Sequence, residues 1–176
     1  MPAASVRFFS RQDMSLLQSL RSFARRVTPM IGAVALMSAC STAESTAPNI
    51  PSNPAVETYA SATGVVIAQM TKVNENLYVR DALVGTGAEA VAGRRISVAY
   101  KGMLTNGQVF DQGTISFNLG VGEVIPGWDQ GVVGMKVGGS RKLVIGSNLA
   151  YGNRGAGGAI PPNATLVFDV TLNGVQ

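Results

Sequence analysis

The chain has 176 residues, of which 46% are hydrophobic and 14% are charged, so one packed domain with extensions is expected. It contains no histidine and one cysteine, which excludes a Ser-His-Asp triad, a Cys/His zinc site and an intrachain disulfide. The formal net charge of +4 arises in the first 40 residues, and because the rest of the chain carries equal numbers of acidic and basic residues, nucleic-acid binding is not expected.

Residues 1–40 are predicted to be a leader that directs export. Arginines and serines precede a short apolar stretch, residues 27–39, which falls below the about 20 residues needed to span a bilayer. The stretch ends in Leu36-Met37-Ser38-Ala39-Cys40, which resembles the signal of bacterial lipoproteins, whose cysteine becomes the lipidated first residue. That resemblance implies a protein anchored to the membrane through Cys40, on the periplasmic side of the cell envelope. The basic part is long, and translation from Met14 instead of Met1 would shorten it.

Two other interpretations of the leader remain open. Cleavage after Ala43 would release a soluble secreted protein, because small residues also lie at this point. An arginine- and serine-rich start with few acidic residues also fits an organelle transit peptide. In both alternatives Cys40 is an inert residue of a discarded leader.

Residues 41–70 are predicted to form a flexible tether. Residues 41–63 are rich in Ser, Thr, Ala, Pro and Asn and have few large apolar side chains to bury. The expected role of this stretch is to hold a domain away from a membrane surface. The apolar residues 65–68 that follow fit either a strand or a helix.

Residues 71–176 are predicted to form one turn-rich β domain. This part of the chain holds nearly all of the 21 glycines, which favours tight turns between short strands. Apolar and polar residues alternate over residues 96–101 and 166–172, as they do in strands with one buried face. Further strands are expected at residues 77–84, 115–119 and 141–145.

A hairpin is expected where Asn106-Gly107 lies between Met103-Leu104 and Val109-Phe110. This dipeptide is typical of a two-residue hairpin turn, in which both central residues adopt φ > 0.

A short helix is expected after Val124-Ile125-Pro126-Gly127-Trp128. Proline is tolerated in a first helical turn, because its missing N–H would have no intrahelical partner there. Trp128, Val132 and Met135 fall at i, i+4 and i+7, which places them on one helix face. The spacing alone indicates only a structural role for Trp128, as the largest side chain of the core. The predicted fold class is α+β, with a twisted antiparallel sheet of roughly five strands wrapped on this one short helix.

Two glycine-rich stretches match phosphate-binding patterns only superficially. Gly85-Thr86-Gly87-Ala88-Glu89-Ala90 follows a predicted strand, but a further strand follows it, so no helix N-terminus is available for a pyrophosphate. Residues 152–158 are predicted to form a loop. No nucleotide cofactor is therefore expected.

Five segments, taken together in order and spacing over roughly residues 77–173, resemble the FKBP-type peptidyl-prolyl isomerases, the immunophilins that bind tacrolimus and rapamycin. The segments are Val98-Ala99-Tyr100-Lys101-Gly102, Gly107-Gln108-Val109-Phe110-Asp111, Glu123-Val124-Ile125-Pro126-Gly127-Trp128, Ala150-Tyr151-Gly152 and Ile160-Pro161-Pro162-Asn163-Ala164-Thr165-Leu166-Val167-Phe168-Asp169-Val170.

The resemblance implies an aromatic pocket that isomerises X–Pro bonds of exported polypeptides without a cofactor or metal, and that tacrolimus- or rapamycin-type macrolides inhibit. It implies that Trp128 is the pocket floor, that Asp111 orients its neighbours and that the Tyr151 hydroxyl and the Ile125 N–H donate hydrogen bonds to the substrate. The other residues that it places in the pocket walls are Tyr100, Phe110, Val124, Ile160 and Phe168.

The sequence departs from the family pattern around the pocket. The short loop at residues 112–114 lacks a basic residue often found there, Ile115 replaces a frequent aromatic residue, and residues 156–159 lack large side chains. These departures concern substrate preference and macrolide affinity more than activity. Two alternatives remain, a non-catalytic peptide-binding or chaperone module on the same fold and a structural membrane-anchored protein. The complete aromatic set favours the enzyme.

Overall fold

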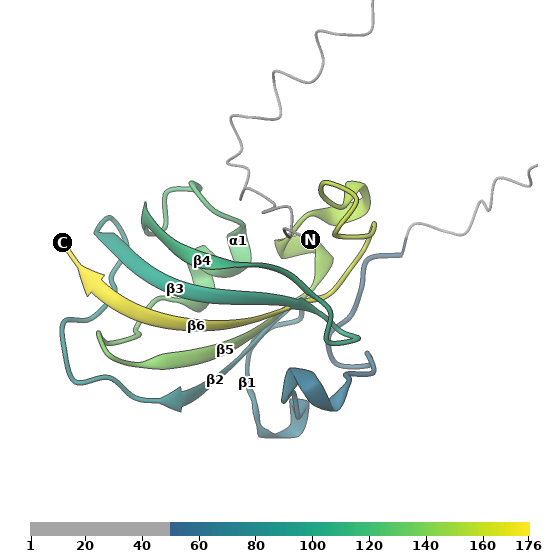
Figure 1. Cartoon of the computed structure of the whole chain (residues 1–176), viewed down its shortest axis with the longest axis horizontal. Coiled ribbons are helices and arrows are strands. Elements are labelled where there is room, and N and C mark those ends of the chain that lie inside the picture. Colours follow the sequence, from purple (N-terminus) through teal and green to yellow (C-terminus); the bar gives the residue numbers. More distant parts are fainter. Residues whose placement is uncertain (1–49) are drawn as a thin grey trace, which may run out of the picture.

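A six-stranded antiparallel sheet forms the body of the protein in the computed structural model, which describes residues 50–176 (Figure 1). The predicted leader, Cys40 and residues 41–49 of the predicted tether lie outside the described residues. The strand order is β1-β2-β5-β6-β3-β4. The strands are β1 (Thr71–Asn74), β2 (Leu77–Leu83), β3 (Arg95–Leu104), β4 (Val109–Asn118), β5 (Ser140–Ile145) and β6 (Leu166–Val175).

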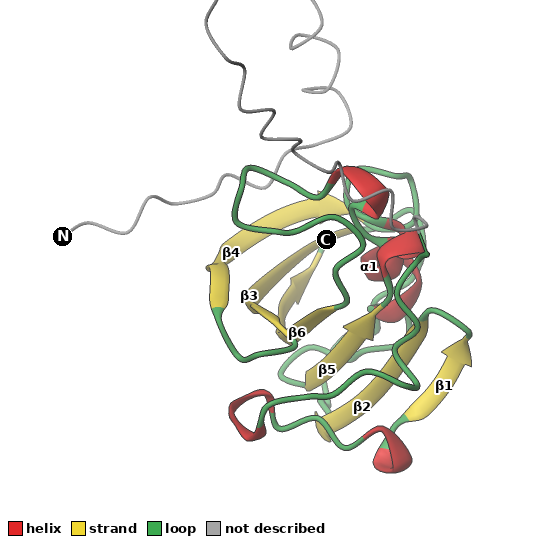
Figure 2. Ribbon diagram, turned by 90° about the vertical axis from the view of Figure 1, so that its right-hand side faces the viewer, coloured by secondary structure: helices red, strands yellow, loops and turns green. Residues whose placement is uncertain are grey.

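One short helix, α1 (Pro126–Gly131), packs inside the curve of the sheet (Figure 2). The helix approaches β5 closely because two of its residues lack side chains. A Cβ atom on Gly127 would lie 2.3 Å from Cγ2 of Ile145, and one on Gly131 would lie 3.0 Å from Cδ2 of Leu143. The predicted α+β class is therefore confirmed, with β1 as a sixth strand at the sheet edge that the sequence pattern did not reveal.

The helix ends earlier than the apolar spacing predicts. Trp128, Val132 and Met135 are all buried, as expected for one face, but the helix stops at Gly131. Gly134 then adopts φ = 80°, and the N–H of Gly134 donates to the carbonyl of Ala90 at 2.9 Å. The chain leaves the helix because it pairs with the loop after β2 instead of continuing its own helical bonds.

The β3–β4 hairpin has the predicted place but a different turn. Gly107 adopts φ = 87°, whereas Asn106 is absent from the positive-φ residues among those described. The Gly107 N–H donates to the Leu104 carbonyl at 2.9 Å, and the Asn106 side-chain oxygen accepts from the Gln108 N–H at 2.9 Å. The prediction of positive φ at both residues was wrong, because the longer connection between the strands needs a left-handed residue at one position only.

Residues 50–70 differ from the flexible tether that we expected over residues 41–70. They pack across the outer face of the sheet, opposite α1, and include two short 3₁₀ turns, Ser61–Thr63 and Ile67–Gln69. Their apolar side chains cover a row of outward-facing residues on four strands. This second cluster consists of Tyr59, Val65, Ile67 and Met70 on Tyr78, Met103, Val144 and Val167.

Polar contacts fix the same segment on the sheet. The Ala60 N–H donates to the Thr105 carbonyl at 2.8 Å, and Lys142 Nζ donates to the Thr63 carbonyl at 2.6 Å. Composition did not reveal this packing, because only a few apolar side chains of the segment are buried and their partners lie far away in sequence. Among residues 50–176, no helix is long and apolar enough to cross a membrane.

Candidate active site

Four aromatic side chains meet between α1 and the sheet, and we call them the aromatic cluster: Tyr100, Phe110, Trp128 and Phe168. Trp128 is fully buried and lies at the centre of the aromatic cluster. Its ring centroid lies 5.2 Å from that of Tyr100 and 5.3 Å from that of Phe168, with interplanar angles of 77° and 86°. Phe110 meets Phe168 at 5.6 Å and 90°. Such edge-to-face contacts are the arrangement that aromatic rings prefer.

The aromatic cluster requires a glycine on the strand between its rings. Gly102 pairs with Phe168 of β6 and with Asp111 of β4. A Cβ atom at Gly102 would lie 2.6 Å from Cζ of Phe110 and 2.9 Å from Cε1 of Phe168. Sequence reasoning did not name Gly102 as a site residue, although a glycine inside a strand is a known sign of close approach.

Asp111 fixes the Tyr100 ring. The residue is 9% exposed, and Oδ2 accepts a hydrogen bond of 2.7 Å from the Tyr100 hydroxyl. Oδ1 accepts from the Gln112 N–H at 2.9 Å. Burial raises the pKa of the Tyr100 hydroxyl, and the hydrogen bond to Asp111 and its charge raise it further. The tyrosine therefore remains a protonated donor at neutral pH.

A β-bulge lets Phe110 and Asp111 both face inward. Consecutive side chains of a regular strand point to opposite faces. Here Gly102 pairs with Asp111 and Met103 pairs with Val109, so Phe110 is an extra residue without a partner position on β3. Both side chains are buried as a result.

The loop between β5 and β6 supplies Tyr151 and Ile160. Tyr151 is half-buried against the core cluster, and Ile160 is buried. Burial first, and then the negative charge of Asp111, raises the pKa of Tyr151 to about 12. Ala156 and Ile160 exchange two backbone hydrogen bonds of 3.0 Å that close the loop tip. Tyr151 thus offers a hydroxyl donor beside the aromatic cluster.

Val124 and Ile125 form the entry to α1, and both are 8% exposed. The Ile125 carbonyl accepts from the Trp128 N–H at 2.9 Å, whereas the Ile125 N–H makes no hydrogen bond within residues 50–176.

Two acidic residues that sequence reasoning did not name hold this entry in place. The Asp129 carboxylate accepts from the N–H groups of Gly120 and Gly122, each at 2.8 Å. Glu123 accepts from the backbone and the side chain of Asn118, and these bonds lower the pKa of Glu123. Asp129 in the first helical turn was the available signal, because acidic residues bind N–H groups there.

All nine predicted pocket residues thus lie in or beside one buried cluster: Tyr100, Phe110, Asp111, Val124, Ile125, Trp128, Tyr151, Ile160 and Phe168. Their individual roles stay predictions, and Cys40 lies outside the described residues.

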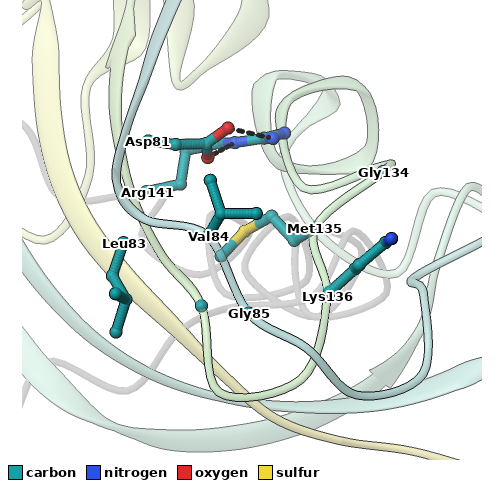
Figure 3. Close-up of a pocket in the computed structure, with 9 residues that line it drawn as sticks. Asp81, Leu83, Val84, Gly85, Gly134, Met135, Lys136 and Arg141 are labelled. Atoms are coloured by element: carbon teal, nitrogen blue, oxygen red, sulfur yellow. Dashed lines mark hydrogen bonds and ion pairs between the residues drawn. The ribbon is translucent and has the colours of Figure 1, made fainter.

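A small cavity elsewhere contains none of these residues (Figure 3). Arg141 lines it and binds Asp81 through Nε at 2.6 Å and through a second nitrogen at 3.0 Å. The same guanidinium donates to the carbonyls of Gly131 and Val133, at the end of α1. Because all these bonds are internal, we assign the cavity a structural role at the helix terminus.

Comparison with known proteins identifies similar chains. The family model for FKBP-type peptidyl-prolyl cis-trans isomerases matches residues 87–173. The FK506-binding protein of Neisseria meningitidis serogroup A is 52% identical over 102 residues, which cover 55% of this chain and 94% of that protein. The crystal structure of a peptidyl-prolyl cis-trans isomerase from Pseudomonas syringae superposes with a TM-score of 0.56 at 34% identity, covering 61% of this chain and 81% of that one.

A longer relative matches over one part of its length. FK506-binding protein 4 of Rhizopus delemar is 53% identical over 108 residues, which cover 59% of this chain but only 28% of that protein. The chain described here therefore corresponds to nearly the whole bacterial relative and to about a quarter of the fungal one.

Proposed function

The chain belongs to the FKBP-type peptidyl-prolyl cis-trans isomerases, and we propose that it isomerises X–Pro bonds of exported polypeptides at the aromatic cluster. The observation that carries the proposal is the edge-on contact of Tyr100 and Phe168 with Trp128, next to an Asp111 carboxylate whose two oxygens are already bonded. The site is apolar and presents neutral donors.

Such a site suits the energetics of the reaction. Rotation about an X–Pro bond is slow because it breaks amide resonance, with a barrier of about 18–20 kcal/mol. The twisted transition state has lost that resonance, so its carbonyl oxygen carries less charge than that of the planar amide. A pocket lined by aromatic rings therefore favours the twisted form over the planar one, which is differential binding of the transition state and needs no nucleophile.

Two donors complete the proposed mechanism. The Tyr151 hydroxyl, which stays protonated at neutral pH, donates to a carbonyl of the bound peptide. The Ile125 N–H donates a second hydrogen bond and aligns the peptide along the entry to α1. Asp111 keeps the Tyr100 ring in place and transfers no proton.

The residue before proline is proposed to be apolar. Ile115 and Ala159 are partly buried against the core, and Ile160 is buried beside them in the same cluster. A glutamate side chain at this position would lose water against this apolar surface, so Leu-Pro and Phe-Pro peptides should react faster than Glu-Pro.

We also propose that macrolides of the tacrolimus type bind at the same place. The Neisseria relative carries the name FK506-binding protein and is 52% identical to this chain over the matched residues. Competition between such a macrolide and the peptide would place both at the aromatic cluster.

A protease-coupled peptide isomerisation assay tests these proposals and distinguishes the enzyme from a non-catalytic peptide-binding module. The expected result is catalysis that is faster on Leu-Pro and Phe-Pro than on Glu-Pro and that a tacrolimus-type macrolide suppresses. Equal rates on all three peptides without macrolide competition would contradict the assignment of the site.

We propose further that the protein is exported and held at the membrane through lipidated Cys40, with soluble secretion as the alternative. The support is the sequence of the leader, where an apolar stretch at residues 27–39 precedes the single cysteine.

A further inference from the structure

The loop that carries Tyr151 and Ile160 spans residues 146–165, between β5 and β6. Hydrogen bonds between Ala156 and Ile160 close the tip of the loop. Nearer its middle, the Asn163 N–H donates to the Gly152 carbonyl at 2.8 Å. These bonds fix the shape of the loop. Its placement against the rest of the domain also depends on how its two ends are held.

The first end of the loop is bound by Ser52. The Ser52 Oγ accepts from the Ser147 N–H at 2.8 Å, and the Ser147 Oγ accepts from the Ser52 N–H at 3.1 Å. Ser147 is 1% exposed and begins the 3₁₀ turn Ser147–Leu149. The residue that precedes this turn, Gly146, has no side chain that could cap it. The hydroxyl of Ser52 therefore supplies the cap from a segment 95 residues away in sequence.

Other residues of the same segment extend the contact. Pro54 is buried on Gly146, where an added Cβ atom would lie 3.1 Å from the proline Cδ. The Tyr59 hydroxyl donates to the Pro54 carbonyl at 2.7 Å, and the Tyr59 ring packs on the second cluster. These contacts hold the segment in place on the sheet.

The far end of the loop meets the segment again. The hydroxyl of Thr165, a buried residue directly before β6, lies 3.4 Å from the Glu57 carboxylate to which it donates. One segment, residues 52–60, thus touches both ends of the loop. This segment precedes the residues matched by the family model, which begin at residue 87.

We propose that residues 52–60 form a clasp that holds the loop in its productive position, and that Ser52 is a positioning residue for Tyr151. The inference rests on the proposed function, because it concerns the loop that supplies the hydroxyl donor. The Ser147 carbonyl accepts from the Ala150 N–H at 3.0 Å, so a shift of Ser147 is passed directly to the residue before Tyr151. Removing the Ser52 hydroxyl leaves a buried N–H without its acceptor, which favours opening of the loop start.

The test uses the full chain with Ser52→Ala, with Ser52→Thr as a rescue that keeps the hydroxyl. Ser61→Ala is the matched control, because Ser61 is an exposed serine directly after the clasp, at the start of the 3₁₀ turn Ser61–Thr63. We expect kcat/KM on a Leu-Pro peptide to fall about three- to tenfold in Ser52→Ala, to recover in Ser52→Thr and to stay unchanged in Ser61→Ala.

Amide hydrogen exchange separates positioning from general loosening. In Ser52→Ala, exchange should rise at residues 147–154 and remain unchanged over the β3–β4 hairpin, residues 95–118. Unchanged loop exchange, a rise over the whole domain, or a loop that opens without loss of rate would each overturn the clasp. If the unmodified chain isomerises no X–Pro peptide, the proposed function fails by itself, and the exchange pattern still decides whether Ser52 holds the loop.

Discussion

The glycine between the aromatic rings gives the sharpest test of the site. In Gly102→Ala the added Cβ atom would lie 2.6 and 2.8 Å from two atoms of the Phe110 ring and 2.9 Å from Phe168. Carbon atoms in contact are ordinarily about 3.5–4.0 Å apart, so at least one ring has to move by about 1 Å. The moving rings belong to the proposed pocket wall. Gly113→Ala is the matched control on the neighbouring strand, where the nearest atoms, on the Tyr100 ring, are 3.8 Å away.

The magnitude follows from the difference between these two variants. Both glycines lie outside the positive-φ residues, and both substitutions reduce the entropy of the unfolded chain, which stabilises by about 0.4–1 kcal/mol. Only Gly102→Ala adds a methyl group to a filled core, which costs about 1–3 kcal/mol. The free energy of unfolding should therefore be about 1–3 kcal/mol lower in Gly102→Ala than in Gly113→Ala.

The same displacement of the rings should also lower activity. Displacement of a reacting or binding group by about 1 Å can cost as much as a hundredfold in rate, so we expect kcat/KM to fall at least about tenfold in Gly102→Ala and to change less than twofold in Gly113→Ala. Urea unfolding and the protease-coupled assay, each at a temperature where both variants are folded, give the two quantities. Equal stability and equal kcat/KM in both variants would refute the packing argument for the aromatic cluster.

Three further predictions concern the donor, the pH dependence and the anchor. Tyr151→Phe keeps the ring but removes one hydrogen bond, so kcat/KM should fall several-fold, by about 1 kcal/mol, and Phe110→Ala should cost more; full activity in both folded variants would place catalysis elsewhere. With no histidine in the chain and with the Tyr151 pKa raised to about 12, its hydroxyl stays protonated below that pH, so kcat/KM should be nearly flat from about pH 6 to 8, and a bell-shaped profile would argue for proton transfer. Cys40→Ser should abolish lipid labelling and move the protein from the membrane to the soluble fraction, and an unchanged distribution would exclude the lipid anchor.

Local patterns of the sequence were sufficient for most of the fold. The alternation in residues 166–172 predicted β6, where Leu166 and Phe168 are fully buried and Asp169 is exposed. Such a pattern depends only on the two-residue period of a strand, so it can be read without knowledge of the partners. The helix start at Pro126 was also predictable, because the preference of proline for the first helical turn depends only on local structure.

The order of the motifs named the residues that meet in the aromatic cluster, but it did not reveal their geometry. The motif that contains Phe110 and Asp111 places them side by side in sequence, where a regular strand would separate them. The extra residue in β4 brings both to the inner face, and this bulge depends on the pairing with β3. The need for glycine at position 102 is likewise a property of two neighbouring strands, because the atoms it accommodates belong to Phe110 and Phe168.

By itself the sequence determined the α+β class, the strands with clear alternation and the short helix. Only the tertiary structure decided that residues 50–70 pack on the sheet and that Ser52 reaches Ser147. The outward row of Tyr78, Val144 and Val167 forms only when three strands lie in register. A polar, proline-containing segment has too few apolar residues to reveal a buried face in its own pattern. Its order comes from a surface that exists only after the sheet has formed.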